Sequence, residues 1–357
     1  FYGAEYAMND VNSSGIEENI FTNSFNIAPS RYPQSTWQTL GLYLNDEHKI
    51  TEKLTLQAGI RYTHYMLDAS FDTPFFAFPF TDANTDNGAL TGGLGAVYKV
   101  NDKTVFRINA STAFRSPNVD DLGKVFDSEP GAVVVPNPNL NAEYAYNADI
   151  GVTKIIGDVL KLNLTGYYTV LENAMVRRNY SLNGQDSLVF DGVLSQVQAL
   201  QNAAAANVYG VQTGFEINFT KGFLLSSQFN YQKGIEEMND GSISPSRHAA
   251  PWFGITRLSY TYRDLQLQLY AQYQGERGHD DLSVSEQGKD DIYALDENGN
   301  TFAPAWYTLN FKMMYQLTDT FSVSGGIENI TDQRYRPYSS GLSGAGRNFI
   351  LSLTASF

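Results

Sequence analysis

Gly346-Arg347-Asn348-Phe349-Ile350-Leu351-Ser352-Leu353-Thr354-Ala355-Ser356-Phe357 closes the chain with alternating apolar and polar side chains. Every second residue from Phe349 to Phe357 is apolar, and only Ile350 interrupts the polar face. A period of two is typical of a β-strand, and a terminal strand needs partners at its edges. We interpret this stretch as the closing strand of a barrel, with its apolar face toward lipid and its polar face toward a wet or plugged lumen.

The composition of the 357 residues favours one large β structure. The chain has many Tyr (23), Phe (22) and Gly (30) residues and few Pro (12). Aromatic residues are typical of the interface girdles of a membrane barrel. No run of 18 apolar residues exists, which excludes a membrane-spanning helix but not membrane-spanning strands. The net charge of −14 argues against nucleic acid as a partner, and the absence of Cys excludes a disulfide framework and a thiolate metal site.

Alternation of side chains between clusters of Gly, Asn, Asp and Pro predicts fourteen strands. We expect them at residues 1–11, 37–49, 53–67, 88–100, 104–114, 143–156, 159–174, 207–219, 223–233, 251–262, 265–274, 305–317, 321–330 and 346–357. On the strands at 159–174 and 265–274 the alternation is almost free of exceptions. Because a cation facing lipid is costly, we assign Lys161 and, on the strand at 104–114, Arg107 to the lumen side. The prediction is an all-β, transmembrane, antiparallel β-barrel.

The connections between these strands alternate in length. Very short ones, such as residues 50–52, 101–103 and 157–158, alternate with long ones at about 12–36, 68–87, 115–142, 175–206, 234–250, 275–304 and 331–345. Outer-membrane barrels have short periplasmic turns and long external loops. A soluble β-sandwich, the alternative, has no reason to place all long loops at one end.

Two boxes in the third long loop carry a family resemblance. They are Phe114-Arg115-Ser116-Pro117-Asn118 and Asn137-Pro138-Asn139-Leu140-Asn141-Ala142-Glu143. Together with Glu328-Asn329-Ile330-Thr331-Asp332-Gln333-Arg334-Tyr335 and the closing strand, they resemble the TonB-dependent receptors of the bacterial outer membrane. Without that resemblance, the same boxes would be read as residues that shape the strand exits, since Pro interrupts a β-ladder.

The resemblance implies a 22-stranded barrel that encloses an amino-terminal plug domain. Residues 1–357 would then be the carboxy-terminal part of the barrel domain, with about fourteen strands present and the plug and first eight strands absent from this chain. It further implies as partners the chain's own plug and missing strands, outer-membrane lipid, and an inner-membrane energy-coupling protein that acts through the plug.

The segment Tyr335-Arg336-Pro337-Tyr338-Ser339-Ser340-Gly341 resembles the haem and haemoglobin receptors of Bacteroidetes-type bacteria. In that group the paired boxes bracket a segment with a haem-ligating His, but residues 119–136 of this chain contain no His. The resemblance ranks haem first as substrate, then a ferric siderophore, then cobalamin, a glycan or a peptide. It also makes a surface lipoprotein or a haemophore a candidate partner.

Candidate ligand-binding residues lie in or beside the external loops: Arg115, Arg247, His248, His279 and Tyr338. A neutral imidazole can ligate haem iron, and the planar fork of Arg fits carboxylates, as in an anionic siderophore. The alternative for each is an ordinary surface residue. We identify no catalytic residue, resident metal ligand or cofactor site, because no Ser-His-Asp or paired-carboxylate spacing is present.

Two further loop features have open interpretations. The acidic residues of loop 275–304 are expected to be solvated, although residues 296–300 faintly resemble a calcium loop. The Phe-rich run 71–80 must pack on something: neighbouring loops, a protein partner or an apolar ligand.

Energy-coupled uptake of an iron-containing nutrient is therefore the leading hypothesis for function. The alternative is a passive porin or a surface-binding adhesin barrel without energy coupling. Pairing of residues 1–11 with residues 346–357 would give a closed fourteen-stranded barrel and favour that alternative.

Overall fold

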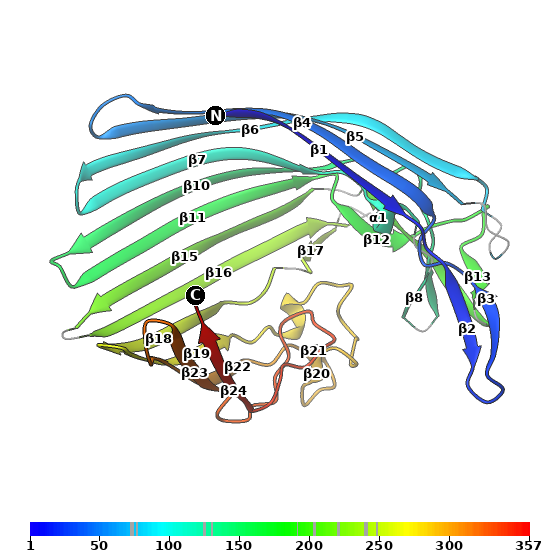
Figure 1. The fold of residues 1–357 in the computed structure, drawn as a ribbon. Helices are drawn as coiled ribbons and strands as arrows, with labels where there is room; N and C mark the ends of the chain where they lie inside the picture. The colour runs from blue at the N-terminus through cyan, green and yellow to red at the C-terminus, as the bar shows by residue number, and fades with distance from the viewer. Residues whose placement is uncertain are drawn as a thin grey trace.

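The computed structural model describes residues 1–71, 75, 78–123, 126–129, 131–190, 192–202, 205–219, 222–238, 242–247 and 249–357. One large antiparallel sheet dominates them and curves into an incomplete barrel (Figure 1). Its strands, in spatial order, are β1 (Tyr2–Val11), β4 (Gln34–Lys49), β5 (Leu54–Ser70), β6 (Asp82–Asn101), β7 (Thr104–Arg115), β10 (Glu143–Ile156), β11 (Leu160–Glu172), β15 (Ala206–Asn218), β16 (Phe223–Glu237), β18 (Phe253–Tyr262), β19 (Leu265–Gln274), β22 (Trp306–Gln316), β23 (Phe321–Glu328) and β24 (Asn348–Ala355). The fourteen predicted strands are confirmed.

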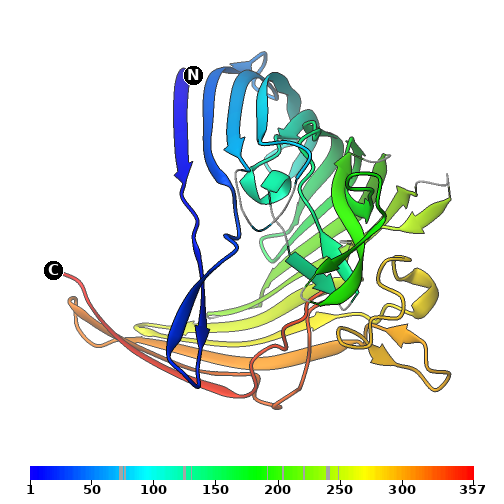
Figure 2. The ribbon, with the colours of Figure 1, turned by 90° about the vertical axis from the view of Figure 1, so that its right-hand side faces the viewer.

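The sheet is open along one side. Among the described residues, β1 pairs only with β4 and β24 only with β23, so the two end strands do not meet (Figure 2). Residues 1–11 are thus not paired with the closing strand, and a closed fourteen-stranded barrel is excluded for this structure.

The two faces of the sheet have different chemistry. On β5, Leu56, Ile60 and Tyr62 project from the outer face, where they are 40, 51 and 45% exposed. Above this apolar band, His64 Nε2 lies 3.0 Å from Asp86 Oδ1, which marks a return to polar surroundings. The inner face carries the assigned cations: Lys161 lies 3.2 Å from Glu216, and Arg107 donates a hydrogen bond to Thr153.

Several strands extend further at the external end than the sequence pattern predicted. Strand β5 ends at Ser70 rather than 67, and β6 begins at Asp82 rather than 88. Beyond the apolar band no lipid contacts the outer face, so the alternation fades while backbone pairing continues from Leu54↔Tyr98 to Ser70↔Asp82.

Two segments that we expected to be loops form a second sheet, here called the inner sheet. It comprises β8 (Phe126–Glu129), β9 (Ala132–Val134), β12 (Met175–Asn179), β13 (Ser187–Phe190) and β14 (Val193–Asn202), with β9 and β14 parallel. Val133, Val135, Val197 and Ala199 form its core. The inner sheet and the short helix α1 (Val119–Gly123) lie within the curve of the barrel at its external mouth (Figure 2).

An apolar cluster fixes α1 and its flanking loop to the barrel. Leu67 and Ala69 of β5 are buried there with Val119, Leu122 and Leu140. Part of the Phe-rich run joins this cluster, since the rings of Phe71, Phe78 and Phe80 contact one another at centroid distances of 5.1 to 5.8 Å. These three rings therefore pack among loops; Phe76 lies outside the described residues.

The remaining elements are short and lie in external loops. They are the hairpin β2 (Gly15–Asn19) and β3 (Ser24–Ala28), the strand β17 (Ile243–Pro245), the 3-10 helix η1 (His279–Asp281), and the pair β20 (Ala294–Leu295) and β21 (Thr301–Phe302). None of the helices in the described part of the chain combines the length and apolarity that a membrane crossing demands.

Candidate functional site

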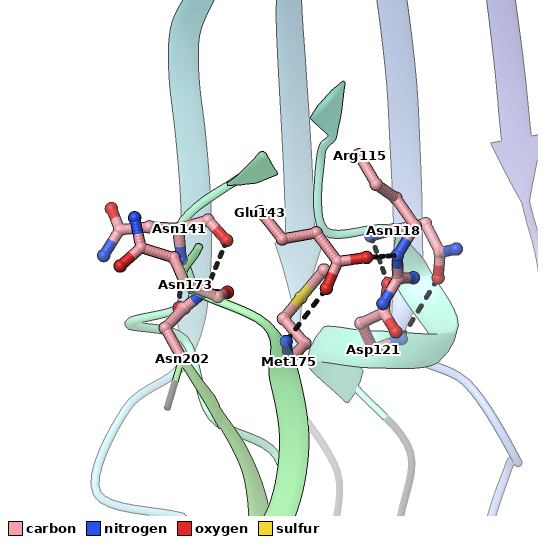
Figure 3. A network of polar contacts seen from close by, with 8 residues as sticks. All are labelled: Arg115, Asn118, Asp121, Asn141, Glu143, Asn173, Met175 and Asn202. Atoms are coloured by element: carbon pink, nitrogen blue, oxygen red, sulfur yellow. Dashed lines mark hydrogen bonds and ion pairs between the residues drawn. The ribbon is translucent and has the colours of Figure 1, made fainter. Parts of the chain in front are cut away.

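The first box, residues 114–118, anchors α1 to the barrel at the external mouth (Figure 3). Arg115 ends β7, and its guanidinium lies 2.8 Å from Asp121 on α1 and 2.7 Å from Glu143 at the start of β10. Asn118 and Asp121 exchange hydrogen bonds in a reciprocal cap of α1, and Glu143 also accepts one from the backbone N–H of Met175. Arg115, proposed from sequence as a ligand contact, thus connects β7 with α1 and β10, and its partner Glu143 extends the network to β12.

Side-chain amides attach the second box, residues 137–143, to the inner sheet. Asn202 on β14 exchanges hydrogen bonds with the backbone of Asn141 and donates a third to the carbonyl of Asn173 (Figure 3). Asn137 donates to the carbonyl of Leu200 and is 6% exposed. These side chains satisfy backbone groups where the chain leaves the barrel, which keeps the inner sheet attached to β10 and β11.

A buried carboxylate organises the opposite side of the mouth. Glu286 is fully buried; its Oε1 lies 2.9 Å from Arg247 Nε and 3.1 Å from Lys289 Nζ, and its Oε2 accepts a 2.7 Å hydrogen bond from Tyr293. The Arg247 N–H does not point at the carboxylate, so this contact is an ion pair without a hydrogen bond. We call Arg247, Glu286, Lys289 and Tyr293 the Glu286 cluster.

This cluster corrects one expectation from sequence. The acidic residues of loop 275–304 were predicted to be solvated, and Asp280, Asp281, Asp290, Asp291 and Glu297 are exposed, but Glu286 is 0% exposed and paired with two cations. A buried charge is tolerated only when it is paired and hydrogen-bonded. The residues next to Glu286 in the sequence are polar, so no local apolar pattern indicated that Glu286 is buried.

Neighbouring contacts join three external loops around the Glu286 cluster. Ser244 Oγ in loop 234–250 accepts a hydrogen bond from the backbone N–H of Val284. From loop 331–345, Arg336 donates to the carbonyls of Asp291 and Ile292 at 2.6 and 2.7 Å. Loops 234–250, 275–304 and 331–345 are therefore one connected body at this side of the mouth.

Tyr338 packs inside this body. Its ring lies 6.2 Å from that of Tyr293, and the guanidinium of Arg277 stacks over it at 5.4 Å. Burial, reinforced by hydrogen bonding to Glu286 and by its negative charge, raises the pKa of Tyr293, and burial likewise raises the pKa of Tyr338. Both phenols are therefore neutral at physiological pH, and Tyr293 donates its proton to the hydrogen bond with Glu286.

The His candidates differ in what the structure describes. His279 begins η1, and its Nδ1 lies 3.0 Å from the carbonyl oxygen of Thr301. When Nδ1 carries the proton and donates to this carbonyl, Nε2 retains a lone pair, which is the tautomer used by metal-ligating His. His248 lies outside the described residues.

The faint calcium-loop pattern of residues 296–300 forms a closed turn. Asp296 Oδ1 accepts hydrogen bonds from the backbone N–H groups of Asn298 and Asn300, both at 2.8 Å, and these bonds lower the pKa of Asp296. Across the part of the chain that the structure describes, no group of three or more His, Asp or Glu could hold a metal ion.

Several buried donors at the mouth have no acceptor among the described residues, and two of them belong to residues paired across neighbouring strands. Gln274 and Trp306 face each other across β19 and β22, and no described residue accepts from Gln274 Nε2 or Trp306 Nε1. Sequence reasoning missed both residues because they belong to ordinary alternating strands.

The comparisons with known proteins agree with the fold. Residues 1–330 match the family model "TonB dependent receptor-like, beta-barrel", and the chain therefore belongs to the TonB-dependent receptor β-barrel family. Members of this family are receptors and transporters rather than enzymes, and they are proteins of the outer membrane.

Individual relatives are distant. The chain is 22% identical over 354 residues to the iron-regulated outer membrane virulence protein of Vibrio cholerae, which covers 96% of this chain and 48% of that protein. It is 24% identical over 381 residues to the heme/hemopexin utilization protein C of Haemophilus influenzae, covering 100% of this chain and 48% of that protein. The chain thus spans about half the length of these relatives.

Solved structures show the same fold. The copper transporter OprC superposes with a TM-score of 0.75 at 15% identity, over 100% of this chain and 53% of that one. The ferric-catecholate import receptor Fiu of Escherichia coli K12 gives a TM-score of 0.66 at 17% identity, over 100% of this chain and 51% of that one.

Proposed function

We propose that the complete protein is an outer-membrane receptor for energy-coupled uptake of an iron-containing nutrient. The observation that carries this proposal is the open sheet: fourteen strands end in two unpaired edges, β1 and β24, in a chain that spans about half of its relatives. An exposed sheet edge must find a partner. Eight further strands and a plug, preceding residue 1, would supply one and link the receptor to an inner-membrane energy-coupling protein.

The alternative of a passive porin or adhesin has less support. The inner sheet and α1 occupy the external mouth, and the Arg115 and Asn202 contacts hold them there. A passive pore needs an open path, whereas a receptor needs a wall that encloses its ligand. The anchored inner sheet favours the receptor.

For the substrate we propose haem first and a ferric siderophore second. His279, with Nδ1 held by the Thr301 carbonyl, has the arrangement that suits an iron ligand. The name of the Haemophilus influenzae relative, a heme/hemopexin utilization protein, agrees with haem.

Growth of a deletion strain tests the function. We expect the strain to lose growth on haem as the sole iron source and to regain it with the complete gene. Growth should also require the inner-membrane energy-coupling protein. Growth on haem that persists without that protein would refute energy coupling, and loss of growth only on a ferric siderophore would select the second substrate.

Spectra of bound haem test the ligand. Titration of the complete protein should give a Soret band that shifts in the His279→Ala variant, with His248→Ala as the parallel variant and His48→Ala, beside a short turn, as the control. Unchanged spectra for both loop variants would remove His ligation from the proposal.

A further inference from the structure

The hairpin β2–β3 has one apolar and one polar face. Its register pairs Ile16 with Ile27 and Glu18 with Phe25, which places three large apolar side chains on one face. The other face carries the pairs Glu17 with Asn26 and Asn19 with Ser24. Such one-sided patterning indicates a hairpin that covers something, or is covered by something, on its apolar face.

That face has no partner among the described residues. Ile16, Phe25 and Ile27 are 71, 65 and 83% exposed, and Ile20 and Phe21 at the tip are 77 and 91% exposed. The turn itself is well defined, because Asn19 Oδ1 accepts hydrogen bonds from the backbone N–H groups of Phe21 and Thr22. A two-stranded hairpin is only marginally stable in water unless it packs on another element.

Lipid does not explain this apolar face. His64 marks the upper limit of the apolar band on β5. Leu40 of β4 pairs with His64, and Tyr6 of β1 pairs with Leu40, so Tyr6 lies at the same level. From there β1 continues to Val11, a path of about 17 Å at roughly 3.4 Å per residue, before the hairpin starts at Gly15. The hairpin therefore belongs to the external crown, beyond the membrane.

The position of the hairpin indicates what covers it. In Figure 2, which looks onto the external end, the hairpin runs along the open side of the sheet, between the β1 edge and the β24 edge. This is where the external loops of further barrel strands would emerge. We propose that the apolar face of β2–β3 packs against external loops of the strands that precede residue 1, and so joins the two parts of the crown. The inference rests on the proposed 22-stranded receptor.

Cysteine labelling of the complete protein tests this inference, because residues 1–357 contain no Cys that would react. Single variants Phe25→Cys and Ile27→Cys probe the apolar face, and Asn26→Cys, between them on the polar face, is the matched control. A membrane-impermeant maleimide should modify the two apolar-face variants about tenfold more slowly than the control. This difference should hold both in intact cells and in purified protein in detergent.

Three outcomes overturn the proposal. Equal rates at all three positions would show a free face, and protection only in cells would show that another molecule covers it. To guard against misfolded variants, a photo-crosslinking phenylalanine analogue at Phe21 provides a conservative second probe. It should crosslink within the protein to residues upstream of residue 1, and crosslinks only to other proteins would again overturn the inference. Growth on haem is a separate measurement, so each failure is distinguishable from failure of the receptor function.

Discussion

Glu286→Gln should loosen one side of the external mouth without unfolding the barrel. The substitution keeps the side-chain volume, and Tyr293 can still donate to the amide oxygen. It removes the charge that pairs with Arg247 and Lys289 at 2.9 and 3.1 Å. Arg247 then keeps its electrostatic contact with Glu236, and Lys289 loses its carboxylate partner.

The magnitude follows from these contacts. A hydrogen bond to a charged acceptor contributes about 1 kcal/mol more than one to a neutral acceptor. Arg247 and Lys289 are 37 and 25% exposed, so water screens them and each ion pair adds roughly 0.5 kcal/mol. The total is about 2 kcal/mol, which corresponds to a roughly thirtyfold larger population of locally open loop, since about 1.4 kcal/mol is tenfold.

Hydrogen exchange measured by mass spectrometry is the assay. Peptides covering residues 282–295 and 336–340 should exchange about thirtyfold faster in the variant, in proportion to the open population. Strand β19 should be unchanged. Glu297→Gln is the matched control, because Glu297 lies in the same loop but is exposed. Equal exchange in the wild type and Glu286→Gln, or equal acceleration in Glu297→Gln, would refute a structural role for the buried carboxylate.

Three further predictions concern the barrel wall, the inner sheet and pH. Leu269→Arg should impair assembly by about 2 to 4 kcal/mol because Leu269 faces lipid, whereas Arg at the lumen-facing position 268 (Gln268→Arg) should be tolerated. Heat-modifiable migration in gels measures the folded fraction of each variant. Equal folding of both variants would contradict the assigned faces. Asn202→Leu should remove three exposed hydrogen bonds to backbone groups of two loops and open β14 to protease, by about 2 kcal/mol, whereas Gln201→Leu, which removes one such bond, should have a smaller effect. Because the pKa of Tyr293 is raised, the folded loops should lose stability as pH rises above about 10, by about 1.4 kcal/mol per pH unit from this phenol, and Tyr293→Phe should remove that share of the slope in hydrogen exchange while the share of Tyr338 remains.

The barrel was predictable because lipid imposes a strong local rule. Within the apolar band, each outward residue of a strand such as β19 must be apolar, so Leu265, Leu267 and Leu269 indicate the strand without any knowledge of its neighbours. Above the band this rule no longer applies. The external extensions of β5 and β6 therefore carried no readable pattern, although their pairing is continuous.

The inner sheet and the Glu286 cluster were not predictable for a different reason. Strands β9 and β14 pair in parallel between residues such as Val133 and Val197, which lie far apart in sequence. Burial of Glu286 depends on Arg247 and Tyr338 arriving from two other loops. Arg247, His279 and Tyr338 were selected by residue type, and the structure brings them to one side of the mouth, whereas Arg115 lies in the separate anchor of α1.

The two anchors of the mouth differ in how they can be opened. The inner sheet is attached through several hydrogen bonds of Glu143, Asn137 and Asn202, most of them to backbone groups at strand exits. Loss of any one leaves the others intact. The Glu286 cluster instead concentrates two cations and a phenol on a single carboxylate. Loss of this one carboxylate charge therefore weakens every contact of the cluster at once, whereas the described contacts of the inner sheet have no such single point of attachment.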